Sequence, residues 1–191
     1  LSPYGKPKYL SEMEKILVIE KDGLFHLNLN YFDHHTKGVQ TTMLENNDPT
    51  PSLFYSKKNM EKVFGKLRGA NEKINQHHID IASSVQVHCE NVIFHLLKKL
   101  HKSTGSKNLC IAGGVAQNSV ANGKIISNTS FEKLYIPPAA HDAGTSIGSS
   151  LYYFYTNISK SKWEIMNNPY LGSISTNQEI EEMLSAKKIK Y

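Results

Sequence analysis

The sequence "AGGVAQNSVANGK", residues 112–124, contains the only double glycine of the chain, and it decides the predicted fold. The apolar run Leu-Cys-Ile-Ala at 109–112 predicts a strand over 108–112, and the residues after the glycines predict a helix over 115–127. Free N–H groups at the start of a helix attract phosphate, and glycine lets a ligand approach the backbone. Gly113 and Gly114 therefore predict a nucleotide cradle, although a tight turn without a ligand would explain the same residues. Neither a Rossmann motif nor a Walker motif occurs in the sequence.

A second junction of the same kind follows at residues 136–152, "IPPAAHDAGTSIGSSLY". A strand over 131–136 leads through a turn to a helix over 143–155, whose Gly144 and Gly148 let another backbone or a ligand lie against it. Asp142 stands just before that helix, where it can act as an N-cap or as a metal ligand. Because strand, helix, strand and helix alternate, we predict α/β architecture.

Upstream of the double glycine, one long helix dominates the predicted elements. Apolar residues recur at steps of three or four along 74–103, which predicts a helix that Gly105 ends. Apolar and polar residues alternate over 24–29, which predicts the second strand of a hairpin with one buried face. The other predicted segments are a strand over 16–20, a loop over 36–56, a helix over 57–65, a linker over 157–177 and a helix over 178–186.

Length and composition limit the classes of protein that the chain can belong to. With 191 residues, 39% of them hydrophobic, it is long enough for one domain with a core, or for a domain with a short appendage. No apolar run approaches the roughly 20 residues that span a membrane. The net charge of +5 comes from dispersed lysines, so a nucleic-acid partner is not expected. Cys89 and Cys110 are isolated and predict buried thiols in a reducing compartment, the cytoplasm.

The two strand–turn–helix corners resemble the nucleotide-binding core shared by actin, sugar kinases and heat-shock chaperones. More closely, they resemble the carbamoyltransferase family of nodulation protein U and the antibiotic O-carbamoyltransferases, whose transferase domain is similar to the protein that makes threonylcarbamoyladenosine on tRNA. Further segments that follow this family in order are "SPYGKPKY" (2–9), "DGLFHLNLNYFDHHT" (22–36), "GKLR" (65–68), "HIDIASSVQ" (78–86) and "NPYLG" (168–172).

The resemblance implies a fold and a domain organisation. The fold is an actin-like ATPase (ribonuclease H-like) lobe, incomplete in this chain. Residues 1–156 would form the second half of the transferase domain, and residues 157–191 a linker and the start of the following adenylate-forming domain. Because the chain starts at Leu1 without a methionine, we also expect it to be a segment of a longer polypeptide.

The resemblance also implies an activity. Family enzymes join ATP and carbamoyl phosphate into carbamoyl-adenylate and transfer the carbamoyl group to the hydroxyl of a small-molecule acceptor. We expect this chain alone to be inactive, and we leave a homodimer open. The alternative function is a nucleotide-binding or regulatory module of the same fold without transfer. A sugar or acetate kinase is a weaker third option, because the motifs of those kinases do not occur.

Site residues carry over from the family one by one, and no catalytic residue is assigned. Nucleotide contacts are implied for Gly113, Gly114, Val115 and Asn118. Asp142 is implied as one ligand of a divalent metal, usually iron, whose other ligands include an H-x-x-x-H pair that this sequence lacks.

Arg68, the only arginine, is also a candidate nucleotide ligand, since its planar guanidinium suits phosphate or carboxylate. Chance survival at the surface would explain it equally well. His88 and His95 lie about 10.5 Å apart along a helix, too far to share one ion. We therefore interpret them as core or surface histidines. His141 would either donate to a phosphate or pair with its neighbour.

Overall fold

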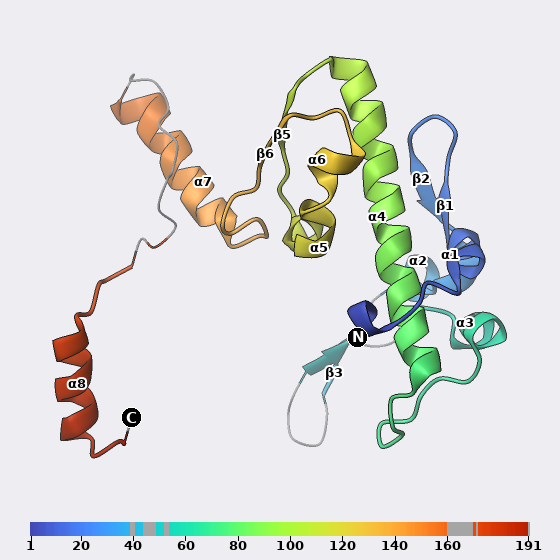
Figure 1. Cartoon of the computed structure of the whole chain (residues 1–191), viewed down its shortest axis with the longest axis horizontal. Helices are drawn as coiled ribbons and strands as arrows, with labels where there is room; N and C mark the ends of the chain where they lie inside the picture. Colours follow the sequence, from blue (N-terminus) through green and yellow to red (C-terminus); the bar gives the residue numbers. More distant parts are fainter. Residues whose placement is uncertain (39–40, 44–48, 52–53, 160–169, 171, 191) are drawn as a thin grey trace. The chain divides into compact units, whose positions relative to one another are not determined.

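A computed structural model of the chain describes all residues except 39–40, 44–48, 52–53, 160–169, 171 and 191 (Figure 1). The described residues form two compact units, Leu1–Ile136 and Pro137–Tyr191. The structure is mixed α/β, and its strands pair into two-stranded sheets, as predicted at the level of fold class. The actin-like lobe and the domain boundary after residue 156 stay predictions.

The first unit contains short strands and helices arranged around one long helix. In chain order these are η1 (Ser2–Tyr4), α1 (Leu10–Ile16), β1 (Leu17–Ile19), β2 (Phe25–Leu27), η2 (Leu29–Tyr31), α2 (His34–Lys37), β3 (Thr41–Met43), β4 (Pro49–Pro51), α3 (Lys57–Phe64), α4 (Gln76–Thr104), β5 (Asn108–Cys110), η3 (Gly114–Gln117), α5 (Ser119–Asn122), α6 (Ile125–Asn128) and β6 (Lys133–Tyr135).

Helix α4 is the organising element of this unit, and it confirms the helix predicted over 74–103. Asn75 caps its start by accepting from the backbone N–H of His78, and Gly105 ends it in the left-handed region at φ 65°. One side of α4 contributes Phe94 and Leu97 to the core. The other members of this core cluster are Leu109, Ile125 and Phe131. Helix α4 therefore packs against the strand and the short helices that surround the double glycine (Figure 1).

The predicted hairpin is confirmed as the antiparallel pair of β1 and β2, with Leu17 opposite Leu27. Two histidines of α4 hold it in place: Nε2 of His88 donates to the Leu17 carbonyl at 2.8 Å, and Nε2 of His95 donates to the Glu20 carbonyl at 2.7 Å. These contacts explain both histidines as structural donors. The expected buried face is wrong, because β2 is exposed along its length. Its apolar side chains line a cavity of about 750 Å³ along α4.

The N-terminal segment is attached to α4 through a buried carboxylate. Asp80 is 2% exposed and accepts from the Lys6 backbone N–H at 2.9 Å. It also accepts from the Lys8 ammonium group at 2.7 Å and from the Gln76 amide at 2.8 Å. The Lys6 N–H, followed by the Lys8 and Gln76 side chains, holds the pKa of Asp80 well below its usual range.

We expect Asp80→Asn to lower the thermal unfolding temperature at pH 7 and to flatten the acid branch of the stability curve. A folded-state pKa below the ordinary value of about 3.8 gives stability that is complete above that pH and is lost as the pH falls below it. Thermal unfolding at pH 7 measures the first effect, and urea unfolding at pH values from 7 to 2 measures the second.

The matched control is Glu132→Gln, which removes a carboxylate from an exposed ion pair with Lys107. Exposed pairs contribute little, so this variant should unfold like the wild type. Equal pH profiles for Asp80→Asn and the wild type would contradict the prediction.

Three predictions about the first unit need correction. The segment 36–56 was predicted as a loop, but it contains the end of α2 and the antiparallel pair of β3 and β4. Prolines fit there because a two-stranded ladder has only edge strands. The predicted helix over 115–127 is divided into η3, α5 and α6. Cys110 is exposed rather than buried. Cys89 is half-buried, and that burial, with Glu90 beside it, raises the pKa of its thiol.

The second unit contains α7 (Gly144–Tyr153), a π-helical turn (Phe154–Ile158) and α8 (Asn177–Ala186). Both predicted helices are therefore confirmed. Thr176 and Glu179 form a capping box that starts α8. Most of the predicted linker over 157–177 lies outside the described residues. Among the helices that the structure describes, none has the length and apolar character needed to cross a membrane.

Candidate functional site

The double glycine forms an exposed turn at the end of a parallel strand pair. Strand β5 pairs in parallel with β6, Leu109 opposite Leu134, and the Ile111 N–H extends the pairing to the Tyr135 carbonyl at 3.1 Å. Gly113 then adopts φ 105° and ψ 168°, a conformation that is essentially restricted to glycine. The chain therefore leaves the strand direction here because Gly113 adopts a backbone conformation that other residues rarely reach.

Gly114 has no such backbone requirement. Its φ lies outside the left-handed region, and a Cβ added there would meet no atom within 4 Å. Among the described residues, the backbone N–H groups of Gly113 and Gly114 donate to no acceptor. The turn thus presents two N–H donors that have no acceptor in the described part of the chain. No side chain fills the space at Gly114, so an anionic or carbonyl acceptor can approach these donors.

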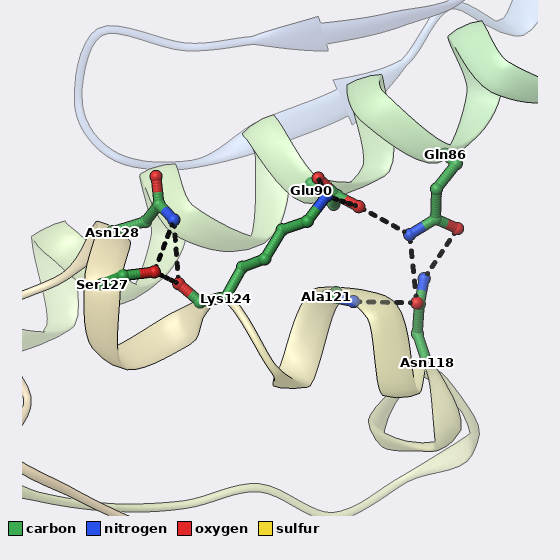
Figure 2. A network of polar contacts seen from close by, with 7 residues as sticks. All are labelled: Gln86, Glu90, Asn118, Ala121, Lys124, Ser127 and Asn128. Carbon is green, nitrogen blue, oxygen red and sulfur yellow. Dashed lines mark hydrogen bonds and ion pairs between the residues drawn. The ribbon is translucent and has the colours of Figure 1, made fainter. Parts of the chain in front are cut away.

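Val115 and Asn118 follow on this turn but point to different surroundings. Val115 is 65% exposed and lines the apolar cavity along α4. Asn118 is the N-cap of α5: its Oδ1 accepts from the Ala121 N–H at 3.1 Å. Its amide also pairs with the Gln86 amide of α4, at 3.1 and 3.2 Å (Figure 2). Asn118 therefore joins the turn to α4, while its predicted contact with a nucleotide stays a prediction.

Arg68 lies in another part of the first unit. Its Nη1 donates to the carbonyl groups of Gly69 and Glu72, so this nitrogen serves the loop that follows α3. The side chain also lines a cavity of about 270 Å³ whose lining residues all come from the segment between Tyr55 and Ile81. No residue of the glycine turn lines this cavity, so the cavity does not join Arg68 to the turn.

Asp142 belongs to the second unit, where its side chain is exposed. The helix α7 begins at Gly144 with Ala143 as its N-cap, and no side chain caps it. The Asp142 carbonyl accepts from the N–H of Thr145, but within the described chain its carboxylate has no partner. The interpretation as an N-cap is therefore wrong, and the carboxylate is available for another role.

His141, which precedes Asp142, accepts a hydrogen bond at Nδ1 from the backbone N–H of Ala143, at 3.3 Å. This contact is local to the turn before α7. Within the described residues, the His141 ring does not pair with the Asp142 carboxylate. Pairing with this neighbour was one of the two roles that the sequence left open.

A divalent metal needs several donors, and the described residues provide one candidate, Asp142. No group of three or more histidine, cysteine, aspartate or glutamate side chains that could hold an ion exists in the described ranges. His88 and His95 already donate to backbone carbonyls. The residues present therefore do not by themselves fit a metal ion, and we derive no chemical step through one.

Three residues beside the turn are not among the predicted site residues: Gln86, Glu90 and Lys124. Glu90 is only 5% exposed and accepts from the Lys124 ammonium group at 2.7 Å. A usable signal existed, because Gln86 ends one of the family-like motifs and Glu90 follows it by four residues on the same helix face. A glutamate that is buried almost always has a partner.

The chain is similar in sequence to one protein family and to several known proteins. A family model described as the carbamoyltransferase N-terminus matches residues 1–151. An uncharacterized protein of Synechocystis sp., sll1178, is 34% identical over the whole chain, which covers 29% of that protein. Nodulation protein NolO of Bradyrhizobium diazoefficiens is 40% identical over 45% of the chain and 16% of NolO. Nodulation protein NolNO of Sinorhizobium fredii is 32% identical over 63% of the chain and 18% of NolNO. The chain thus spans less than a third of each of these relatives.

Proposed function

The chain belongs to the carbamoyltransferase family, and on this premise we propose that it provides the nucleotide-binding turn of an enzyme that transfers a carbamoyl group from carbamoyl-adenylate to an acceptor hydroxyl. The relatives are much longer than this chain, so the proposal assigns the complete reaction to a longer polypeptide. Within it, the part described here binds the adenylate.

The observation that carries the proposal is the exposed turn at Gly113 and Gly114. Two backbone N–H groups without acceptors in the described chain lie next to a position where no Cβ occupies the space. A phosphate oxygen or an adenine nitrogen can accept from such donors at close approach. Because the donors are backbone groups held by a strand end, they need little reorganisation when the ligand arrives.

The proposed chemistry places these donors next to the leaving group. The acceptor hydroxyl oxygen attacks the carbamoyl carbon, the bond from that carbon to the phosphate oxygen breaks, and the hydroxyl proton is released. AMP leaves with the extra negative charge. Hydrogen-bond donors that contact the phosphate stabilise this charge as it develops, so they accelerate transfer as well as binding.

The proposal includes ATP and carbamoyl phosphate as the sources of the adenylate. It also includes a divalent metal, iron in the family, for which Asp142 would supply one carboxylate and the remaining donors would come from outside the described residues. A bound divalent metal would supply Lewis-acid stabilisation of anionic oxygen. The acceptor is a small molecule with a hydroxyl group.

Titration of the 191-residue chain with AMP, followed by calorimetry, tests the binding half of the proposal, and we expect saturable binding of one AMP. The product of the complete reading frame, supplied with ATP, carbamoyl phosphate and candidate hydroxyl acceptors, tests transfer through acceptor-dependent release of AMP. The chain alone should bind without transferring.

The outcomes separate the two candidate functions. Binding by the chain together with transfer by the complete product supports the carbamoyltransferase. Binding without transfer by the complete product favours the nucleotide-binding module. Acceptor-dependent AMP release by the chain alone, or no binding of AMP, would contradict the proposal.

A further inference from the structure

A partly buried polar network joins helix α4 to the segment that follows the glycine turn (Figure 2). Gln86 and Glu90 lie one turn apart on α4. The Gln86 amide nitrogen donates to Glu90 at 2.9 Å and to Asn118 Oδ1 at 3.1 Å, and Asn118 Nδ2 donates back to the Gln86 oxygen at 3.2 Å. The ammonium group of Lys124 donates to both oxygens of Glu90, at 2.9 and 2.7 Å.

The donors and acceptors of this network allow one orientation of each amide. Both N–H groups of Gln86 are used, and Asn118 Oδ1 accepts two hydrogen bonds, from Gln86 and from the Ala121 N–H. A rotated Gln86 amide would direct its oxygen at the Glu90 carboxylate. Because Glu90 is held by Lys124 and its side chain is 7% exposed, its charge fixes the orientation of Gln86, and Gln86 fixes that of Asn118.

Asn118 in turn anchors the C-terminal end of the glycine turn. Its backbone N–H donates to the Val115 carbonyl at 3.0 Å, and the Ala116 N–H donates to the Gly113 carbonyl at 3.0 Å. The Asn122 amide donates to the Ala116 carbonyl at 2.7 Å. The exposed residues Gly113 and Gly114 therefore depend for their position on strand β5 at one end and on Asn118 at the other.

We propose that Gln86 and Glu90 are positioning residues that hold the turn in its ligand-ready form through the amide of Asn118. This inference rests on the proposed function, since the ligand is the adenylate. Asn118 would link the turn to α4, because its Oδ1 already accepts two hydrogen bonds, from Gln86 and from the Ala121 N–H. In this proposal Asn118 acts through the turn and not through the direct nucleotide contact that the family resemblance implies, so loss of the Gln86–Asn118 pair should weaken nucleotide binding indirectly.

A double-mutant cycle on AMP affinity tests the inference. Gln86→Met removes the amide but keeps the length of the side chain, and Asn118→Ser keeps an N-cap for α5 while removing the amide pair. We expect each variant to bind AMP about tenfold more weakly, as the loss of one to two net hydrogen bonds predicts. The double variant should bind like either single variant, because all three lack the same pair.

Hydrogen exchange gives a second readout, independent of any ligand. In Gln86→Met, the N–H groups of Ala116 and Asn118 should exchange about tenfold faster, while the core of α4 keeps its protection. The matched control is Gln178→Met. Gln178 also donates to a glutamate four residues later, Glu182 at 2.9 Å, but lies on α8 in the second unit. This control should change neither AMP affinity nor exchange in the turn.

The outcomes distinguish the inference from the proposed function. If the wild-type chain binds no AMP, the proposed function fails, and hydrogen exchange alone tests the positioning. If the wild type binds and Gln86→Met binds equally with unchanged exchange, the inference is overturned. Additive losses in the double variant would also overturn it, because they would mean that Asn118 contacts the nucleotide directly. If Gln86→Met does not fold, Asn118→Ser gives the same two readouts.

Discussion

Gly114→Val is expected to abolish the binding of AMP and ATP while leaving the fold intact. A Cβ at this position meets no atom within 4 Å, so the valine has room in the folded chain. Its unfolding free energy should stay within about 0.5 kcal/mol of the wild type, as for other exposed substitutions. The valine methyl groups would fill the space where a ligand reaches the free N–H groups, and we expect a loss of affinity of at least about 100-fold by calorimetry, about 2.7 kcal/mol.

Two further glycine variants make this result interpretable. Gly113→Ala places a side chain at φ 105° and should cost about 1–3 kcal/mol of stability, because the backbone itself needs glycine there. Gly172→Val is the matched control, since a Cβ at Gly172 also meets nothing within 4 Å and the residue lies in the second unit. Unchanged AMP affinity in a folded Gly114→Val variant would show that the turn has only a structural role.

Asp142→Asn is expected to remove the metal and the carbamoyl transfer activity of the complete reading-frame product without changing the stability of its metal-free form. An amide is a much poorer ligand than a carboxylate for a hard divalent ion. Because the Asp142 side chain caps no helix in the structure, neither Asn nor Ala should shift the unfolding free energy of the metal-free protein by more than about 0.5 kcal/mol. Elemental analysis should show metal content lowered by about tenfold or more.

The control for this variant is Glu181→Gln, which removes an exposed carboxylate from α8. It should keep both metal and turnover, which separates the effect of position from the loss of one negative charge. Normal metal content and normal turnover in Asp142→Asn would mean that Asp142 is not a ligand. A loss of stability in Asp142→Ala would instead indicate a structural role that the described contacts do not contain.

Several elements of the fold could be predicted from the sequence because local interactions determine them. The bounds of α4 follow from its apolar period and from the cap residues Asn75 and Gly105, which act within one turn of the helix. The β1–β2 hairpin and the turn at Gly113 that follows β5 are likewise determined by residues close together in the sequence. Family membership was likewise accessible, since it depends on motifs and not on their arrangement in space.

For the candidate site, the sequence singles out Gly113 and Gly114 as nucleotide contacts, and that role stays a prediction. The structure shows that they form an exposed turn whose N–H groups have no acceptor within the described residues. The sequence did not reveal Gln86 and Glu90, which act on the turn from another element. It also left the role of Asp142 open between cap and ligand. That question depends on where a helix begins to within two residues, a boundary that propensities do not resolve.

What the sequence alone determined is therefore helix α4, the β1–β2 hairpin, the family and the position of the glycine turn. Only the tertiary structure decided that Asn118 divides the predicted helix over 115–127, because its amide partner Gln86 lies 32 residues away. The same applies to His88, whose partner Leu17 is 71 residues distant. Periodicity and capping depend on interactions between residues about four positions apart or fewer. Which distant group a polar side chain bonds to depends instead on the packing that buries both groups together.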